Sequence, residues 1–359
     1  MNIAVACGGT GGHIFPGLAT AQELVRRGHR VTLWLAGKSG ESEAVAGWAG
    51  PVVRLRASGF DSRPGVGSIR AAWSLLRAAA AGRFVMAKDR PDVVLAMGSY
   101  ASVGPVLAAR SLGVPAVLHE SNVVPGRAIR FLAPRAAAVA ISFEASTFYL
   151  RRANLVLTGM PLRAELIEAA RSLPPRSFNG DRATVLVMGG SGGAKRLNEM
   201  APPALAAVAR EIPSIRIIHI TGRGRESEAR SFYDRSGLNA EVLGFTTDMA
   251  RIYSEADFAI CRAGAATCAE LSLFGLPALL VPYPHAVADH QTANAQAMVK
   301  LGAADMVADA DLAPGWLQEY LLARLRDPAK REAMSRAARA RAQHKATAAL
   351  ADLVERCAA

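Results

Sequence analysis

The fold is decided by residues 3–13, IAVACGGTGGH, in which a short apolar run ends in a cluster of glycines. A helix-like segment, residues 17–27, follows directly. The same pattern returns at residues 184–194, TVLVMGGSGGA, and a helix-like segment follows there at 195–210. Strand, glycine turn and helix form the opening of a Rossmann-type unit. Because the pattern occurs twice, the sequence predicts two similar α/β domains.

The length also agrees with two domains of roughly 150 residues each, since the chain has 359 residues. Hydrophobic residues make up 51% and charged residues 20%, which is typical of a globular protein. Further apolar runs between helical stretches predict parallel strands that are buried on both faces and crossed over by helices. These runs are residues 30–35, 51–55, 93–97, 116–119 and 137–141 in the first half, and 215–221, 240–243, 258–261 and 278–281 in the second.

Several remaining segments carry simpler expectations. Residues 159–162 are expected to lead from the first half to the second, residues 174–180 to form a surface loop, and residues 327–354 to be helical. No run of about 18 uncharged apolar residues is present, so no span of a bilayer is expected, and no secretory signal is expected either. The four cysteines lack C-x-x-C spacing, which predicts buried free thiols and no zinc site; they are Cys7, Cys261, Cys268 and Cys357.

The positive charge of the chain is concentrated in its first half. The whole chain has 42 Lys and Arg against 30 Asp and Glu, a net charge of +12. Residues 1–160 hold 18 basic and 8 acidic side chains, a net charge of +10, which leaves +2 for the rest. The first half is therefore expected either to meet an anionic partner or to stay soluble through its cations; nucleic acid, an anionic membrane surface or a phosphorylated substrate would each fit as the partner.

A glycine-rich turn at a helix start can present backbone N–H groups to an anion. The dinucleotide-binding fingerprint fails here, because the last glycine of G-x-G-x-x-G counted from Gly9 is replaced by Ile14. The P-loop pattern fails in the second half, because Ala194 and Arg196 stand where Gly and Ser or Thr are required. Each loop is therefore either a different phosphate cradle or a tight strand–helix turn without a ligand.

Polar side chains follow three predicted strands of the first half. His13 comes after the first strand, residues 97–102 after another, and residues 119–122, HESN, after a third. Open α/β sheets bind ligands at this carboxyl edge. A helix N-terminus disfavours an imidazolium, which would leave His13 as a neutral base. The alternatives are a structural histidine and a Glu120 that caps a helix or a loop.

In the second half, residues 261–271, CRAGAATCAEL, follow a strand and begin a helix. Small residues there let a ligand approach the helix N-terminus, and the two oxygens of Glu270 could accept paired ribose hydroxyls. His285, Asp289 and His290 invite a metal interpretation, but their spacing matches no ligand pattern and no metal is expected. The D-x-D string at residues 309–311 is expected to be a solvated turn.

In their chain order, these motifs resemble the MurG family of bacterial cell-wall glycosyltransferases. The matching segments are residues 8–19, 97–100, 119–122, 159–163, 189–198, 261–270 and 289–295. The resemblance implies the α/β GT-B fold, two Rossmann-like domains facing across a cleft. It implies an acceptor and membrane-facing domain at 1–161, to which a helix at about 342–359 returns, and a UDP-GlcNAc-binding domain at 162–341.

The implied reaction is an inverting transfer of N-acetylglucosamine (GlcNAc) from UDP-GlcNAc. The muramyl 4-hydroxyl of lipid I, undecaprenyl-pyrophosphoryl-MurNAc-pentapeptide, would attack the anomeric carbon, and lipid II would form. His13 is our choice for general base, with Tyr100 and Glu120 on the acceptor side. Helix N-termini and Arg163 can stabilise the departing UDP, so no cofactor and no metal are expected.

The remaining residues implied by the resemblance are contacts of the donor. Thr10, Gly11 and Gly12 would face the sugar or its phosphates, Asn122 the sugar, and Arg163 and Ser191 the nucleotide. The backbone of Thr246 would meet uracil, Glu270 the ribose and Gln291 the sugar hydroxyls. The helix start that wraps the phosphates and ribose comprises Ala265, Ala266, Thr267, Cys268, Ala269 and Glu270. The chain departs from the family pattern at Gly192, Ser121 and His290.

Residues 68–88 predict a helix whose apolar side is formed by Ile69, Trp73, Leu75 and Leu76, with positive charge from Arg70, Arg77, Arg83 and Lys88. It is either packed in the core with a solvated basic face or docked on the anionic cytoplasmic face of the bacterial inner membrane, as a peripheral protein. The expected partners are UDP-GlcNAc, lipid I, that membrane surface and other cell-wall synthesis proteins.

Two other functions compete with this interpretation. One is a GT-B enzyme with another sugar nucleotide or acceptor, or a GT-B epimerase, which only the acceptor side would separate. The other is a binder of nucleic acid or membrane without enzymatic activity. Aromatic residues are only 6% of the chain and form no stacking stripe, so no nucleic acid is expected as a partner.

Overall fold

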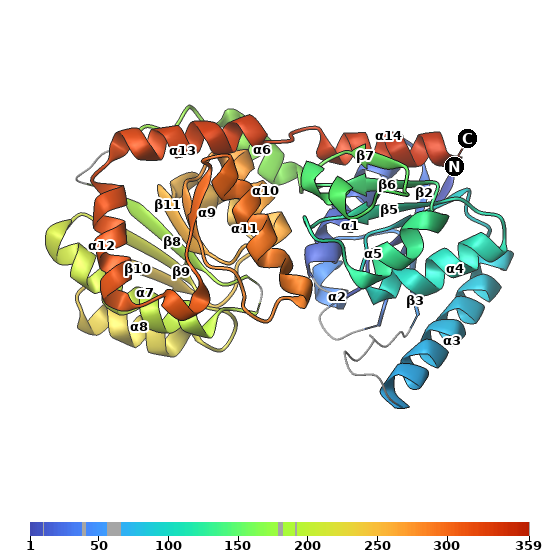
Figure 1. Ribbon diagram of the computed structural model, residues 1–359, viewed down its shortest axis with the longest axis horizontal. Coiled ribbons are helices and arrows are strands. Elements are labelled where there is room, and N and C mark those ends of the chain that lie inside the picture. The colour runs from blue at the N-terminus through green and yellow to red at the C-terminus, as the bar shows by residue number, and fades with distance from the viewer. Residues whose placement is uncertain (10, 38–40, 56–65, 179–181, 191, 359) are drawn as a thin grey trace. The chain divides into compact units, whose positions relative to one another are not determined.

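The computed structural model describes residues 1–9, 11–37, 41–55, 66–178, 182–190 and 192–358, with the backbone alone for 66–72. The chain divides into two compact units. Unit 1 consists of Met1–Arg163 with His344–Ala359, and unit 2 of Ala164–Gln343. Each unit is a parallel sheet with helices packed on it (Figure 1).

The sheet of unit 1 has the strand order β3-β2-β1-β4-β5-β6-β7, and neighbouring strands are parallel throughout. The order reverses direction between β1 and β4, which is the switch point where open α/β sheets bind ligands. The strands are β1 Asn2–Ala6, β2 Arg30–Leu35, β3 Val52–Arg54, β4 Val93–Ala96, β5 Ala116–Glu120, β6 Ala138–Ile141 and β7 Leu155–Leu157.

The two faces of this sheet belong to two separate apolar cores, because successive side chains of a strand point to opposite sides. Ile3 and Val5 of β1 lie in one core, and Ala4 and Ala6 lie in the other. Helices α1 (Gly11–Arg26) and α14 (Ala346–Ala358) cover the first core. Helices of the second core are α3 Val66–Lys88, α4 Val103–Ser111 and α5 Arg127–Leu132.

Unit 2 repeats the design with the strand order β10-β9-β8-β11-β12-β13. Its switch point lies between β8 and β11. The strands are β8 Thr184–Met188, β9 Arg216–Ile220, β10 Ala240–Leu243, β11 Phe258–Cys261, β12 Ala278–Leu280 and β13 Ala304–Met306. The helices are α6 Ala164–Ser172, α7 Lys195–Glu211, α8 Glu226–Arg235, α9 Met249–Glu255, α10 Ala265–Phe274, α11 His290–Lys300, α12 Pro314–Leu325 and α13 Pro328–Arg341.

Unit 1 is completed by a helix from the end of the chain. Thr347 of α14 holds Leu162 twice, since its hydroxyl accepts from the Leu162 amide at 3.2 Å and donates to the Leu162 carbonyl at 3.1 Å. Leu350 and Val354 of the same helix are fully buried. Figure 1 shows α14, in red, lying along unit 1, where it packs against α1.

Three expectations from the sequence need correction. The segment 174–180 is not simply a surface loop, because Phe178 is buried and the Arg176 guanidinium donates to the Phe274 carbonyl at 2.9 Å. The helical stretch 327–354 is two helices, α13 and α14. Asp309 is not a solvated turn residue, since it pairs with the buried Arg262 at 2.5 Å.

The four cysteines are free thiols, as expected, but Cys357 is partly exposed and departs from the expected burial. Cys7, Cys261 and Cys268 are buried, and burial raises the pKa of the Cys7 and Cys268 thiols to about 12. They are therefore protonated and unreactive at neutral pH. Among the helices of the described residues, none is both long enough and apolar enough to cross a membrane.

Candidate active site

The loops after β1, β4 and β5 meet at one edge of unit 1, because these three strands are neighbours and parallel. Helix α1 begins at Gly11, which places His13 in its first turn. A Cβ built on Gly98 would lie 3.4 Å from Cδ2 of His13, and one on Gly9 would lie 4.0 Å from Nδ1. The imidazole is therefore packed between two glycine loops that leave room for it.

Ser99 ties the β4 loop to the first glycine loop. Its hydroxyl donates to the Gly8 carbonyl at 3.1 Å and accepts from the Ala101 amide at 3.2 Å. The backbone of Ser99 is left-handed, with φ of 65°. A strained backbone held by such bonds is a feature of sites that require exact placement. The residue that follows, Tyr100, starts a short 3-10 helix and is partly exposed.

Glu41 is an important residue of this edge that the sequence analysis missed. Its carboxylate is 2% exposed and accepts from the Gly9 amide at 2.8 Å and the Gly37 amide at 2.7 Å. The Gly9 amide is therefore satisfied inside the protein and is not offered to an external anion. No local pattern signals this role, because Glu41 lies 32 residues from Gly9.

Glu120 shapes the loop that carries Asn122. The carboxylate is 3% exposed, and it accepts from the Asn122 amide at 2.8 Å, the Asn122 side chain at 3.2 Å and the Gly126 amide at 2.9 Å. Burial raises the pKa of this carboxyl above its usual range. Glu120 and Asn122 therefore lie together, and the hydrogen bonds of the Glu120 carboxylate fix the conformation of the loop that carries Asn122.

His119 lies beneath the same edge and is fully buried. Its Nε2 atom is 3.0 Å from the Gly159 carbonyl and 3.2 Å from the Ser142 hydroxyl. Burial lowers the pKa of His119 to about 4, and the nearby His13 contributes to the lowering. His119 is therefore neutral at pH 7 and connects the sheet to the segment that leaves unit 1.

The second glycine loop is packed tightly in unit 2. A Cβ on Gly193 would lie 2.1 Å from the Thr221 carbonyl oxygen, and the backbone there has φ of +69°. At the neighbouring strand β11, helix α10 begins after Gly264, and no side chain caps its first turn. The first residues of α10, Ala265 to Thr267, are small, so an anion can reach the helix N-terminus.

Helix α11 braces the residue just before that N-terminus. The Gln291 side-chain oxygen accepts from the Ala263 amide at 3.2 Å and from the Tyr283 amide at 3.0 Å. The buried Asn294 side chain donates to the Ala263 carbonyl at 3.1 Å. Because the Gln291 oxygen is engaged, a ligand hydroxyl would meet its amide nitrogen. Asn294 was not singled out in the sequence, although it lies in the motif 289–295.

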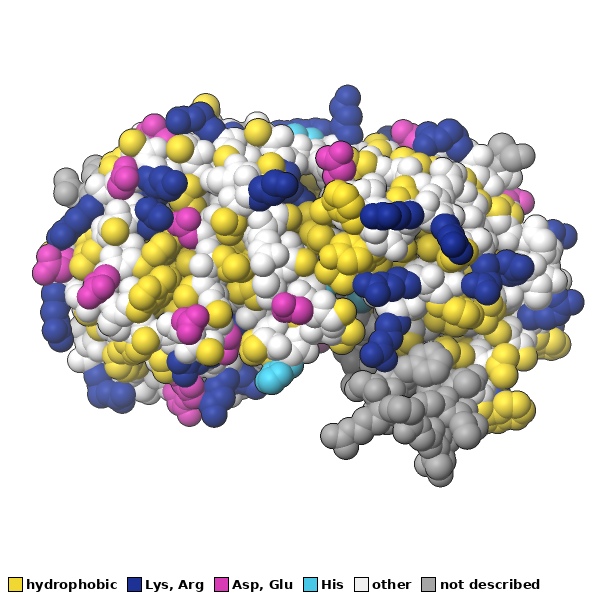
Figure 2. All heavy atoms as spheres, in the orientation of Figure 1, with side chains coloured by type: hydrophobic (Ala, Val, Ile, Leu, Met, Phe, Trp, Pro, Cys, Tyr) yellow, Lys and Arg dark blue, Asp and Glu magenta, His cyan; other side chains and the backbone are white. Residues whose placement is uncertain are grey.

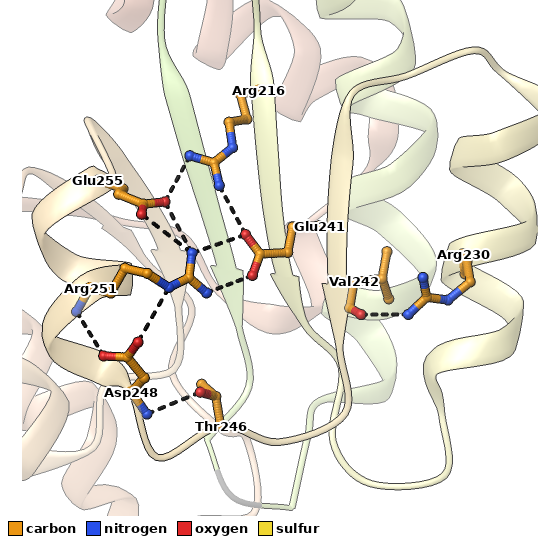
Figure 3. Close-up of polar contacts among 8 residues, drawn as sticks. All are labelled: Arg216, Arg230, Glu241, Val242, Thr246, Asp248, Arg251 and Glu255. Carbon is orange, nitrogen blue, oxygen red and sulfur yellow. Dashed lines mark hydrogen bonds and ion pairs between the residues drawn. The ribbon is translucent and has the colours of Figure 1, made fainter.

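Glu270 and Thr246 are connected through helix α9. The Tyr253 hydroxyl donates to Oε2 of Glu270 at 2.7 Å. At the other end of α9, the Thr246 hydroxyl accepts from the Asp248 amide at 3.0 Å, as Figure 3 shows. The predicted ribose and uracil residues are thus attached to the same short helix.

The other predicted site residues have the following positions. In unit 1, the Arg163 guanidinium lies 5.6 Å from the centre of the Phe15 ring, and Gly11 and Gly12 begin α1. In unit 2, Cys268 is buried and Ala269 is partly exposed on α10. Thr10, Ser191 and the side chains of Ile69 and Arg70 lie outside the described residues. In the described part of the chain, no three His, Cys, Asp or Glu side chains form a group that could hold a metal ion.

The predicted membrane helix is α3, and it exposes large apolar side chains. Trp73 is 65% exposed, Leu76 57% and Phe84 65%. The expectation that Leu75 shares this side is wrong, because Leu75 is buried on a different face of the helix. Arg77 is exposed beside the apolar side chains. Figure 2 shows apolar side chains, in yellow, along the coloured part of this helix.

Two Rossmann-like units with polar loops and helix N-termini at their sheet edges are the architecture of the GT-B class, to which nucleotide-sugar glycosyltransferases belong. Two family models agree with this class. Glycosyltransferase family 28 N-terminal domain matches residues 3–141, and Glycosyltransferase family 28 C-terminal domain matches residues 184–354.

The relatives identify the family more closely. A protein of Hahella chejuensis is 40% identical over 96% of this chain and 94% of its own, and one of Geobacter sulfurreducens is 34% identical over 98% and 97%. Both are named UDP-N-acetylglucosamine--N-acetylmuramyl-(pentapeptide) pyrophosphoryl-undecaprenol N-acetylglucosamine transferase. The crystal structure of Acinetobacter baumannii MurG is 30% identical with a TM-score of 0.79, covering 99% of both chains. The chain belongs to the MurG family.

Proposed function

We propose that the protein transfers GlcNAc from UDP-GlcNAc to the 4-hydroxyl of the muramyl sugar of lipid I and so forms lipid II. The observation that carries this proposal is the near full-length similarity to relatives that bear this name. Unit 2 would bind mainly the donor and unit 1 mainly the lipid acceptor.

The donor side is supported by the chemistry of α10 and α11. The N-terminus of α10 carries a partial positive charge, which stabilises the diphosphate most when UDP leaves with its full negative charge. Glu270 can accept from both ribose hydroxyls, and the Gln291 amide nitrogen can donate to a sugar hydroxyl. Arg163 adds a permanent cation. With these groups, residues of the chain itself stabilise the negative charge of the departing UDP.

The acceptor side assigns proton transfer to His13. A base must be neutral to accept the proton of the attacking hydroxyl, and the first turn of α1 disfavours the imidazolium form of His13. Asn122, held by Glu120, would contact the GlcNAc, and Tyr100 would help to place the acceptor. Loss of the base should lower kcat, whereas loss of a donor contact should raise the donor KM.

The decisive experiment measures GlcNAc transfer from UDP-GlcNAc to a short-chain lipid I analogue, with and without EDTA. We expect transfer that survives chelation.

His13→Ala should lower kcat by about 10²–10⁴-fold, and Glu270→Ala should raise the donor KM by roughly 10- to 100-fold. If the wild-type protein binds UDP-GlcNAc but transfers no GlcNAc, the proposal that lipid I is the acceptor is refuted. If Glu270→Ala binds the donor as tightly as wild type, the proposed contact of Glu270 with the ribose is refuted.

We also propose that α3 docks unit 1 on the anionic cytoplasmic face of the inner membrane, where lipid I is presented. Its exposed apolar residues, Trp73, Leu76 and Phe84, can insert between headgroups, and Arg77 and Lys88 can pair with anionic lipids. Flotation with vesicles rich in anionic lipid should be reduced in the double variant Trp73→Asp, Arg77→Glu. The matched control in unit 2 is Trp316→Asp, Arg336→Glu, which should float like wild type; equal flotation of both variants would refute the proposal.

A further inference from the structure

The hydroxyl of Tyr253 is buried against a carboxylate that the proposed reaction uses. Tyr253 is 1% exposed, and its hydroxyl donates to Oε2 of Glu270 at 2.7 Å. Hydrogen bonds from a hydroxyl to an ionised carboxylate are short and strong compared with neutral ones. We propose that Tyr253 is a positioning residue, which fixes the Glu270 carboxylate for the ribose and thereby sets the preference for ribonucleotide over 2′-deoxyribonucleotide donors. This inference rests on the proposed function of Glu270.

The bond from Tyr253 is compatible with binding of a ribose. An ionised carboxylate has about four positions at which it can accept hydrogen bonds. One bond from Tyr253 therefore orients Glu270 and leaves acceptor capacity for two hydroxyls. A glutamate without such a bond loses side-chain freedom when it binds its ligand, and this loss weakens binding. Holding the carboxylate in advance removes part of that cost.

The phenol ring is itself held firmly between α9 and α10. It lies 5.2 Å from the ring of Phe274, which is the last residue of α10. The Arg176 guanidinium donates to the carbonyls of Tyr253, Ala256 and Phe274, so it joins the ends of both helices. The direction of the Tyr253 hydroxyl is therefore set by the packing of unit 2.

Helix α9 is also fixed at its sides by ion pairs. The Arg251 guanidinium pairs with Glu241 of β10 at 2.6 Å and with Glu255 at 3.2 Å, and Arg216 of β9 pairs with both carboxylates, as Figure 3 shows. Asp248 caps the helix by accepting from the Arg251 amide at 3.2 Å. The helix that positions Glu270 through Tyr253 is thus anchored to two strands of the sheet.

The test compares the affinities of UDP and 2′-deoxy-UDP by calorimetry, which needs no acceptor. Wild type should bind UDP more tightly. In Tyr253→Phe the ring packing is kept and only the hydroxyl is lost, so we expect the ratio of the two affinities to fall about 3- to 10-fold. The donor KM should rise by a similar factor, with kcat within about twofold. In a Glu270→Ala background, Tyr253→Phe should have no further effect on the ratio.

The matched control is Tyr233→Phe. Tyr233 is equally buried in unit 2, but its hydroxyl lies 3.0 Å from Nδ1 of His219, away from Glu270. This variant should keep the wild-type ratio of the affinities for UDP and 2′-deoxy-UDP. Its melting temperature should show how much thermal stability is lost when a buried tyrosine hydroxyl is removed. A ratio unchanged in Tyr253→Phe but lost in Glu270→Ala would overturn the positioning role. A ratio unchanged in both would overturn the ribose contact of Glu270, and the present proposal with it.

Discussion

At the scale of single residues, His219 couples the stability of unit 2 to pH. It is fully buried, with Nδ1 3.0 Å from the Tyr233 hydroxyl and Nε2 3.1 Å from the Asn198 side-chain oxygen. Burial lowers the pKa of His219 from 6.5 to about 4. Between these values the unfolded chain binds a proton at this residue and the folded chain does not. Stability is therefore lost as the pH falls from 6.5 towards 4.

We predict that His219→Gln reduces this dependence on pH, because glutamine keeps a polar group there but does not titrate. The free energy of unfolding would be measured in urea at about pH 7, 5.5 and 4.5. As the pH falls, the free energy of unfolding should decrease less in His219→Gln than in wild type. The difference should be roughly 1.4 kcal/mol for each pH unit over which folding prevents protonation of His219. The exposed His285, changed to Gln, serves as control. An equal slope in wild type and His219→Gln would contradict the prediction.

The positions of individual candidate residues were predictable from the sequence when a local pattern marked them, and their roles in the site stay predictions. His13 lies in the first turn of α1 and Glu270 in the second turn of α10, and each helix follows an apolar strand, so their positions near the sheet edges could be derived from chain order. Glu41 could not be found in this way, because its partner Gly9 is distant in the sequence. The bond between Tyr253 and Glu270 likewise depends on how α9 packs on α10, which no local pattern encodes.

At the scale of elements, the second glycine loop depends on one position in particular. Gly193 has φ of +69°, and a Cβ there would lie 2.1 Å from the Thr221 carbonyl oxygen. We predict that Gly193→Ala lowers the free energy of unfolding by at least about 1–3 kcal/mol, since the backbone conformation alone has a cost of this size.

Gly192 provides the matched control for this change, because a Cβ there meets nothing within 4 Å. Gly192→Ala should alter stability by no more than about 0.5 kcal/mol. Thermal unfolding of the two variants beside wild type makes the comparison. Equal stability of the two variants and wild type would contradict the prediction, because it would mean that the loop can move away from Thr221 to accommodate a Cβ at residue 193.

The two strands that the sequence did not predict are short and lie at sheet edges. Strands β7 and β13 have three residues each, and each contains an exposed position. They lack the long apolar run of a central strand, and only their pairing with β6 and β12 identifies them. Central strands such as β1 were predictable because burial on both faces requires an uninterrupted apolar run. The exposure of Trp73 on α3 depended on the packing of that helix.

At the scale of the whole molecule, the charge is unevenly shared. Residues 1–160 carry a net charge of +10 out of +12. Figure 2 shows Lys and Arg side chains, in dark blue, gathered over the part of unit 1 that contains α5. We predict that flotation of the protein with anionic vesicles weakens as salt rises from 0.1 M to 1 M, because the screening length falls from about 10 Å to about 3 Å.

Vesicles made only of zwitterionic lipid are the control for this prediction. They should bind the protein more weakly, with little dependence on salt, since only the apolar side chains of α3 contribute there. Binding to anionic vesicles that does not change with salt would show that the positive charge of unit 1 has no part in attachment.

The return of α14 to unit 1 has a consequence for how the protein is made. A ribosome releases residues 164–343 before the residues of α14, so unit 2 has its whole sequence available first. Unit 1 begins at Met1 but lacks Leu350 and Val354 of its core until unit 2 has been synthesised. Domains commonly fold in order from the N-terminus during synthesis. Unit 1 is therefore the first to be synthesised but the last to have its core completed. Until α14 packs on it, the face of its sheet that α14 covers is exposed and can be bound by a chaperone that recognises apolar surface.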